Sequence, residues 1–439
     1  MSINRRDFIK TITTSSVLIP LSACAAPSGR SGSTKARVVV IGGGFGGATA
    51  AKYVKQLDAA VDVTLIEKNP VYTSCPLSNE VLSGERDLAS LQVNYDGLKK
   101  RGVNVMIDEV TAIDPAKKSV TTKGGKTLSY DALIVSPGID FNYAGVEGYS
   151  EALANGDLPH AYKAGPQTLA LKKQLEAMPD GGKFIISVPP APFRCPPGPY
   201  ERASQVANYL THHGKTKSKV IILDANDSFS KKGLFEQAWA MQYPGMIEWV
   251  AGAQDGKVLK IDAKSKTAFT GFGEHKADVL NIIPPHHAGG IAKATGLTNP
   301  KGWCSVDMLT MESTVQKDIY VVGDSCVHGD LPEFGAPKSA HMASTQAKVA
   351  AGAIVAKLNG VAAPEPFFVN TCYSVTAPNW GFSVVHIYKL VDGKLKYVKE
   401  AGGVSPVKMD SEDQMKLQRK LESEYAVGWL KNIMADAFA

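Results

Sequence analysis

The sequence has six cysteines but no CxxC pair and no CxxCH motif. CxxC pairs are typical of zinc ribbons and thioredoxin-like sites, and CxxCH attaches c-type haem. We therefore expect no metal site of the zinc-ribbon type and no haem on this chain.

A strong excess of one charge is also missing. The formal net charge is +6 over 439 residues, and no Lys/Arg cluster has the pattern of a nucleic-acid site. We therefore expect no nucleic-acid partner. The composition, 44% hydrophobic and 21% charged, is that of a globular protein, and the length suffices for two or three domains.

The N-terminus has one apolar run, which is too short to span a membrane. The segment "NRRDFIK" precedes "TITTSSVLIPLSACAA", so a twin arginine, an apolar region and a small-residue exit follow one another. This order predicts a Tat-type signal peptide and a periplasmic location. Two forms of processing stay open: "LSAC" fits a lipobox with a lipid anchor on Cys24, and "ACA" fits cleavage after Ala25 or Ala26.

A glycine-rich turn follows the first hydrophobic strand. In "RVVVIGGGFGGATAAKYVKQL", residues Gly42, Gly44 and Gly47 fit GxGxxG between a strand and a helix. The next strand, "VDVTLIEKN", carries Glu67, which is placed to bind a ribose hydroxyl. Together they predict a dinucleotide-binding βαβ unit.

Two later segments favour FAD as that dinucleotide. "YDALIVSPGI" runs into Pro137 and Gly138, and "KDIYVVGDS" ends a strand at Gly323 and Asp324. In flavoproteins with two dinucleotide-binding domains, the first segment closes the FAD domain and the second returns to it. The small-residue helix "SAHMASTQAKVAAGAIVAKL" then covers the flavin.

A second α/β unit has an unusual turn. The strand "KFIISV" leads into "PPAPFRCPPGPYERA", which has one glycine, and then into a helix and the strand "KVIILD". Proline has no backbone N–H to donate to a phosphate. We therefore expect no NAD(P) site here.

Several motifs together resemble the flavoprotein subunit of flavocytochrome c sulfide dehydrogenase, over essentially the whole chain. The resemblance implies an α/β fold like that of glutathione reductase, with two dinucleotide-binding-type domains and a C-terminal α+β domain. Sulfide:quinone oxidoreductase is a more distant relative. The motifs are "NRRDFIK", "YTSCPLSNEVL", "APFRCPPGPYERASQVA", "KVIILD", "GLTNPKGWCSVD" and "NTCYS".

The segments and the resemblance together predict the domain organisation. It comprises a signal peptide (1–25), a linker (26–34), an FAD-binding domain in two parts (35–154 and 297–362), a second α/β domain (155–296) and a C-terminal interface domain (363–439).

The resemblance implies a covalent flavin. A cysteine at the position of Cys75 forms a thioether to the flavin 8α-methyl in the family, and such a bond typically raises the reduction potential. The alternative is a buried apolar cysteine. The sequence departs from the family pattern at Pro76, where we expect an aromatic residue.

The resemblance also implies a redox-active disulfide between Cys195 and Cys372. Arg194 and Arg202 are expected to attract HS⁻ and to stabilise a thiolate. The alternative is a structural disulfide of an exported protein. Glu201 is either a proton acceptor near this pair or a favourable partner of the helix dipole.

Three further residues complete the expectations from the sequence. Trp429 matches a family aromatic that covers the active site, with a core tryptophan as the alternative. Cys304 is expected to serve packing, and no function is assigned to Cys326.

The activity implied by the resemblance is oxidation of sulfide to sulfur or polysulfide. HS⁻ would attack the disulfide, and the released thiolate would reduce the flavin. Electrons would pass to a c-type cytochrome subunit on another chain. The alternatives are a sulfide:quinone oxidoreductase, disfavoured because "EYAVGWLKNIMADAFA" offers one short amphipathic segment, and a non-catalytic flavin carrier or sulfur-binding protein.

Overall fold

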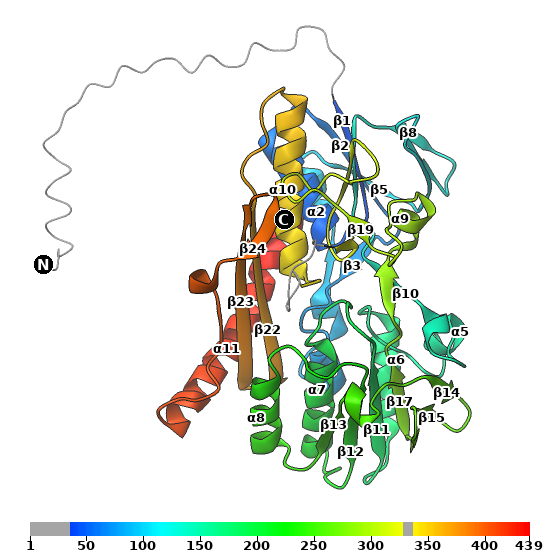
Figure 1. Cartoon of the computed structure of the whole chain (residues 1–439), viewed down its shortest axis with the longest axis vertical. Helices are drawn as coiled ribbons and strands as arrows, with labels where there is room; N and C mark the ends of the chain where they lie inside the picture. The colour runs from blue at the N-terminus through cyan, green and yellow to red at the C-terminus, as the bar shows by residue number, and fades with distance from the viewer. Residues whose placement is uncertain (1–35, 328–336) are drawn as a thin grey trace, which may run out of the picture. The chain divides into compact units, whose positions relative to one another are not determined.

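The computed structural model describes residues 36–327 and 337–439 (Figure 1). The predicted signal peptide and linker, with Cys24, lie outside the described residues. Among the described residues, no helix combines the length and the hydropathy that crossing a membrane requires.

A five-stranded parallel sheet forms the core of the first α/β unit, in the order β20-β9-β1-β2-β5. Its strands are short hydrophobic runs, as expected for a parallel sheet covered on both faces; in β1, every residue after the first is buried. The strands are β1 (Arg37–Ile41), β2 (Asp62–Glu67), β5 (Asn104–Ile107), β9 (Ala132–Val135) and β20 (Ile319–Val321).

Two helices of this unit pack against each other. They are α2 (Phe45–Leu57), which follows the glycine-rich turn, and α10 (Ala340–Leu358), which lies side by side with it in Figure 1. Alanine and glycine dominate the buried face of both helices, so their backbones approach closely. The Ser339 side chain caps α10 by accepting a hydrogen bond from the Met342 N–H.

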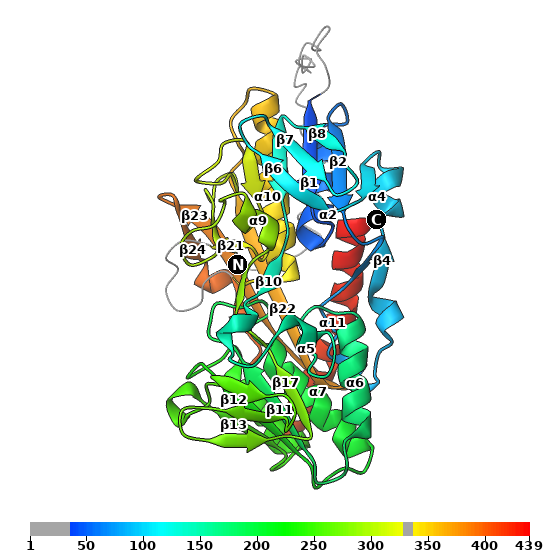
Figure 2. The same cartoon turned by 90° about the vertical axis from the view of Figure 1, so that its right-hand side faces the viewer.

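The second α/β unit has a four-stranded parallel sheet in the order β13-β12-β11-β17, with α7 beside β11 and β12 (Figure 2). Its strands and helices are β11 (Lys183–Val188), β12 (Lys219–Asp224), β13 (Ile247–Val250), β17 (Val279–Ile282), α6 (Pro166–Ala177), α7 (Gly198–His212) and α8 (Lys232–Gln242).

The C-terminal part is an antiparallel sheet followed by a helix. β22 packs against both α7 and α10, so this part contacts both α/β units. Its elements are β22 (Phe367–Ala377), β23 (Trp380–Val391), β24 (Lys394–Tyr397), β25 (Gly403–Val404) and α11 (Glu412–Phe438).

The terminal helix differs from the short amphipathic segment expected from the sequence. α11 has 27 residues and packs against β22, β23 and α2. Its Phe438 ring stacks on Tyr72 with 5.2 Å between ring centroids, and the Phe45 ring lies 5.7 Å away. The last turns of α11 are therefore part of the core near the glycine-rich turn.

The remaining elements are short. The strands are β3 (Val71–Thr73), β4 (Gln92–Asn94), β6 (Val110–Asp114), β7 (Ser119–Thr122), β8 (Thr127–Ser129), β10 (Ile139–Phe141), β14 (Lys260–Asp262), β15 (Thr267–Phe269), β16 (Glu274–Lys276), β18 (His286–Ala288), β19 (Cys304–Ser305) and β21 (Cys326–Val327). The helices are α3 (Glu80–Ser83), α4 (Asp96–Lys100), α5 (Glu151–Ala154) and α9 (Gly290–Ala294).

Candidate active site

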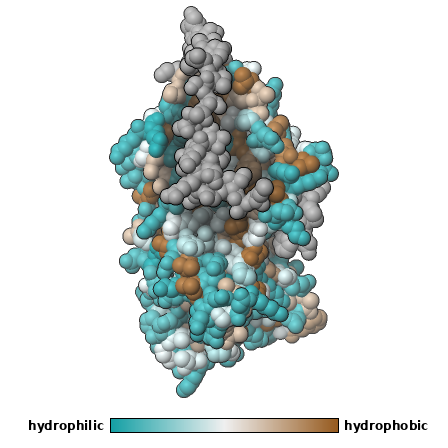
Figure 3. Space-filling view, turned by 90° about the vertical axis from the view of Figure 1, so that its left-hand side faces the viewer, coloured by the Kyte–Doolittle hydropathy of each residue, from teal (hydrophilic) through white to brown (hydrophobic). Residues whose placement is uncertain are grey.

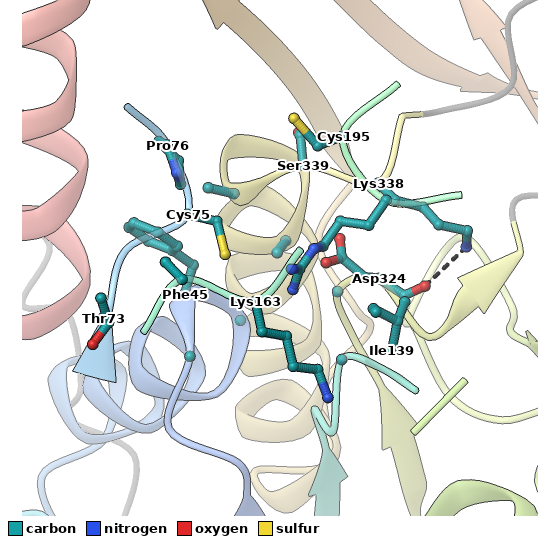
Figure 4. A pocket seen from close by; sticks show the side chains of 18 of the residues that line it. Phe45, Thr73, Cys75, Pro76, Ile139, Lys163, Cys195, Asp324, Lys338 and Ser339 are labelled. Atoms are coloured by element: carbon teal, nitrogen blue, oxygen red, sulfur yellow. Dashed lines mark hydrogen bonds between the residues drawn. The ribbon is translucent and has the colours of Figure 1, made fainter. Parts of the chain in front are cut away.

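A cavity of about 1470 Å³ gathers residues from both α/β units and the C-terminal part (Figure 4). Almost every residue predicted from the sequence for cofactor binding or catalysis lines it. These residues are Gly42, Gly44, Glu67, Cys75, Pro137, Gly138, Cys195, Glu201, Gly323, Asp324, Cys372 and Trp429. Gly47 lies behind the turn rather than at the cavity wall.

The glycine-rich turn has the geometry of a dinucleotide cradle. Gly42 has φ +92°, and a Cβ there would lie 2.3 Å from the Ser136 carbonyl oxygen. A Cβ at Gly47 would lie 1.8 Å from the Gly42 carbonyl oxygen. The Glu67 carboxylate accepts a hydrogen bond of 2.7 Å from the Gly43 N–H, which fixes it at the cavity wall. Only glycine fits both positions, as the fingerprint requires.

Asp324 presents an unsatisfied polar atom to the cavity. Its Oδ1 atom is buried and has no hydrogen-bond partner among the described residues. Burial raises the pKa of this carboxyl, while Arg194 and Lys338 oppose the rise. The Lys338 ammonium donates to the Asp324 carbonyl oxygen at 2.9 Å (Figure 4). A ligand hydroxyl would satisfy Oδ1, so the site fits the ribityl chain of FAD.

Cys75 is half-buried and follows β3 at the cavity wall. In Figure 4 its thiol points into the cavity, which Cys195 reaches from another segment. Pro76 lines the cavity next to it. The position is compatible with a bond to a flavin, and the bond stays a prediction.

The turn after β11 places Cys195 at the cavity. Cys195 has φ +53°, a left-handed conformation that costs a non-glycine residue about 1 to 3 kcal/mol. Its backbone is held from both sides, since its N–H donates to the Lys338 carbonyl at 2.9 Å and its carbonyl accepts from Tyr162 Oη at 2.9 Å. Strain of this kind persists where the surrounding structure enforces it, as at functional sites.

Cys195 and Cys372 are brought to the same cavity although they lie 177 positions apart in the sequence. Both line the cavity and both are free thiols in the structure, so the predicted disulfide is not formed there and stays a prediction. Burial, then the neighbouring Cys372 and Glu201, raise the pKa of the Cys195 thiol well above its usual range, and Arg194 opposes this.

Glu201 lies in the first turn of α7 with its side chain buried. Burial raises the pKa of its carboxyl to about 7, although Lys231 and a hydrogen bond from Asn79 act in the opposite direction. The Asn79 Nδ2 atom lies 3.3 Å from Oε1. A carboxyl with such a pKa can exchange a proton near neutral pH, which favours the proton-acceptor role over simple pairing with the helix dipole.

The two arginines expected to attract an anion differ. The Arg202 guanidinium is buried and donates to the His160 carbonyl at 2.6 Å and the Ala161 carbonyl at 2.7 Å. It is thus occupied by structural contacts, contrary to the expectation. Arg194 lines the cavity, and its Nη2 atom has no hydrogen-bond partner in the described part of the chain. Arg194 is therefore the candidate anion-attracting residue.

The remaining predicted residues lie as follows. The Trp429 ring is half-buried at the cavity wall, 6.0 Å from the Tyr373 ring and 6.2 Å from the His341 ring. Cys304 and Cys326 are fully buried and are not part of the cavity lining. They are free thiols that lie opposite each other on the neighbouring strands β19 and β21. That position agrees with a packing role.

Sequence reasoning missed Lys231, which is not part of the cavity lining but contacts Cys372, which is. The Lys231 ammonium lies 2.8 Å from Ser374 Oγ, 3.0 Å from the Cys372 carbonyl oxygen and 3.8 Å from Cys372 Sγ. In "FSKKGLF" this lysine has the pattern of a solvated charge pair, and the sequence carries no signal for its contact with Cys372.

Comparison with known families gives three matches. Residues 168–284 match the family described as the central part of the sulfide dehydrogenase (flavocytochrome c) flavoprotein chain. Residues 364–438 match the flavin-binding family of flavocytochrome c sulphide dehydrogenase. Residues 36–173 match the pyridine nucleotide-disulphide oxidoreductase family.

Comparison with individual proteins agrees with these family matches. The sulfide dehydrogenase flavoprotein chain of Chlorobaculum thiosulfatiphilum is 56% identical over 45 residues, 10% of this chain and 94% of that one. The mitochondrial sulfide:quinone oxidoreductase of Dictyostelium discoideum is 24% identical over 333 residues, 73% of this chain and 70% of that one.

The solved structures bear on the fold alone. That of the sulfide:quinone oxidoreductase from Aquifex aeolicus has a TM-score of 0.71 at 19% identity, covering 92% of this chain and 91% of that one. The predicted fold class is confirmed.

Proposed function

Because the chain belongs to the family of flavoprotein chains of flavocytochrome c sulfide dehydrogenase, we propose that it is a flavin-dependent oxidoreductase that oxidises sulfide. We propose further that it does so through Cys195 and Cys372 and transfers electrons to a c-type cytochrome subunit on a separate chain. The observation that carries the proposal is the convergence of the two cysteines on a cavity whose other walls fit FAD.

We assign each part of the cofactor to residues that line the cavity. The glycine-rich turn and Glu67 would hold the pyrophosphate and the adenine ribose, and Asp324 would bind the ribityl hydroxyls. Cys75 would form the thioether to the flavin. When bound, FAD supplies the acceptor for the two electrons that sulfide releases.

The chain's own residues supply the sulfur chemistry. With Cys195 and Cys372 joined as a disulfide, HS⁻ attacks one sulfur, the S–S bond breaks, and a persulfide and a thiolate result. Arg194 attracts the anion to the cavity. Glu201, when ionised, accepts the proton that the substrate sulfur loses. Sulfur or polysulfide is the expected product.

The electron acceptor has one alternative. Several relatives are sulfide:quinone oxidoreductases by name, so quinone is the second candidate. On the face drawn in Figure 3, hydrophobic side chains form small, separate patches among hydrophilic ones. Co-purification of a red, haem-bearing subunit supports the cytochrome, and sulfide-dependent reduction of a quinone analogue without such a subunit supports the alternative.

The location is proposed from the N-terminal motif alone. The twin arginine and the apolar run support export to the periplasm by the Tat route, with or without a lipid on Cys24. Mass spectrometry of the mature N-terminus distinguishes lipidation from simple cleavage.

The decisive experiment is anaerobic titration of the purified holoprotein with sulfide. We expect the flavin absorbance near 450 nm to bleach, about one flavin per sulfide, because each sulfide oxidised to the level of elemental sulfur releases two electrons. NADH serves as the comparison and is expected to leave the flavin oxidised. A flavin that stays oxidised with sulfide would contradict the proposed activity.

A further inference from the structure

Lys231 is held against Cys372 by several contacts. Its ammonium is shared between Ser374 Oγ and the Cys372 carbonyl oxygen, and it lies 3.8 Å from Cys372 Sγ. The Phe382 ring lies beneath it, with 5.6 Å from the ammonium to the ring centroid. These contacts leave the charge next to the sulfur rather than free in solvent.

The backbone of Lys231 fixes this position. Lys231 has φ +62°, and its carbonyl oxygen accepts hydrogen bonds from the Leu234 and Phe235 N–H groups, which begin α8. A left-handed conformation at a lysine is uncommon and costs free energy. The start of α8 therefore directs the side chain toward β22.

The second sulfur of the pair has different surroundings. Burial and the neighbouring Glu201 disfavour a negative charge on Cys195, and Arg194 only partly compensates. A cation within about 4 to 6 Å stabilises a thiolate, whereas burial in apolar surroundings disfavours it. The two cysteines are thus electrostatically unequal.

We infer that Lys231 is a catalytic residue that stabilises the thiolate of Cys372 and so determines the direction in which the disulfide opens. HS⁻ attacks Cys195, the Cys195–Cys372 bond breaks, Cys195 keeps the new S–S bond as a persulfide, and Cys372 leaves as the thiolate. The leaving sulfur with the lower pKa leaves faster. The inference rests on the proposed sulfide oxidation and extends it by assigning each sulfur its role.

Other charged or titratable groups also face this pair and must be separated from Lys231. They are Glu201 on α7, Arg194 on the turn after β11, Cys75 after β3 and His386 on β23. Burial and the nearby Lys231 lower the pKa of His386, so its neutral form is favoured and it adds no cation beside Cys372.

The test measures the thiolate of Cys372 without sulfide. The anaerobic holoprotein is reduced with a phosphine, alkylated with iodoacetamide from pH 5 to pH 10, and the Cys372 peptide is quantified by mass spectrometry. In Lys231→Met we expect alkylation at pH 7 to fall about tenfold or more, because an adjacent opposite charge shifts a pKa by one to three units. Lys231→Arg should restore most of the rate.

The neighbouring lysine provides a matched control. Lys232 lies over the Trp249 ring at 4.0 Å and 3.7 Å from Glu236, away from Cys372. Lys232→Met removes the same charge one position along the chain and should alkylate like the wild type. Equal rates in the two Met variants would overturn the inference.

Two further readouts complete the test. If Lys231→Met fails to fold, the wild-type profile decides: a midpoint for Cys372 at or above that of an ordinary cysteine overturns the inference. After one equivalent of sulfide, trapping should place the persulfide on Cys195, and a persulfide on Cys372 overturns it. Failure of the proposed function is recognised separately, since the wild-type flavin would then not bleach with sulfide.

Discussion

The two α/β units place different chemistry on the same strand–turn–helix arrangement. After β1, the turn uses glycines at positions where a Cβ would collide with backbone atoms. After β11, the turn is rich in proline and directs a cysteine into the cavity. The first turn can offer backbone N–H groups to a phosphate, and the second offers a thiol.

The starts of the two following helices continue this difference. A helix N-terminus attracts negative charge, which at α2 a bound pyrophosphate can supply. At α7 the chain supplies its own negative group, Glu201, in the first turn. The comparison shows that the same strand and helix arrangement can carry a glycine-rich turn in one unit and a cysteine-bearing turn in the other.

The largest expected effect comes from removing the thiol of the second turn. Cys195→Ser should lower the rate of sulfide-dependent flavin reduction by at least about 10³-fold, because it removes the sulfur that bonds covalently to the substrate, while flavin content is kept. Stopped-flow absorbance measures the rate. Cys304→Ala, which removes a buried thiol away from the cavity, is the control. Flavin reduction at the wild-type rate in Cys195→Ser would contradict the proposal that the turn after β11 supplies a reactive thiol.

Crowding the first turn should give the next largest effect. Gly47→Ala places a Cβ where 1.8 Å separates it from the Gly42 carbonyl oxygen, so the turn must shift and flavin occupancy should fall more than tenfold. The ratio of flavin to protein absorbance measures occupancy. Gly428→Ala adds a Cβ that meets nothing within 4 Å and should keep its flavin. Full occupancy in Gly47→Ala would show that the first turn is not the cradle.

Neutralising the carboxylate of α7 should have a moderate, pH-dependent effect. Below pH 7, the raised pKa of Glu201 keeps it protonated and unable to accept a proton, so the rate of flavin reduction should rise through about pH 7. Glu201→Gln should lower the rate about 10²-fold above pH 7 and remove this part of the profile.

The substrate gains and loses its proton in the same way with the wild type and with Glu201→Gln. The difference between the two pH–rate profiles therefore reports the contribution of the Glu201 carboxyl. Glu85→Gln, at an exposed position, is the matched control. Identical profiles for wild type and Glu201→Gln would assign Glu201 to the helix dipole alone.

The smallest effect on turnover is expected at Cys75. If the glycine-rich turn already holds the flavin, Cys75→Ala should bind it but release it on acid precipitation, with a lower reduction potential. Absorbance of the acid supernatant measures release. Flavin that stays with the acid-precipitated variant would contradict the thioether.

Much of the fold was predictable because strong local patterns agree with the tertiary structure. The run of valines before Gly42 and the strand before Cys195 both form buried parallel strands as expected. The resemblance to a family also placed Cys372 at the cavity. The domain boundaries stay predictions.

Some features depended on contacts that no local pattern reports. Lys231 carries no sequence signal, since its role depends on β22 lying beside the start of α8. Arg202 is close in sequence to Cys195, which suggested a place at the anion site. Its position on α7 instead directs its guanidinium to the carbonyl oxygens of His160 and Ala161. The length of α11 was underestimated because its apolar residues face several partners rather than one continuous surface.

The walls of the cavity come from segments as distant as Gly42 and Trp429, and this bears on how the protein reaches its native state. Contacts between distant segments carry a large loop-closure entropy, so the pocket is expected to form late in folding. A ligand that binds only the finished pocket shifts the equilibrium by mass action, by about 2.7 kcal/mol at a hundredfold excess over its Kd. Binding of the cofactor is thus expected to stabilise the native state in addition to supplying redox chemistry. The flavin-free chain is therefore expected to be cleaved faster by proteases.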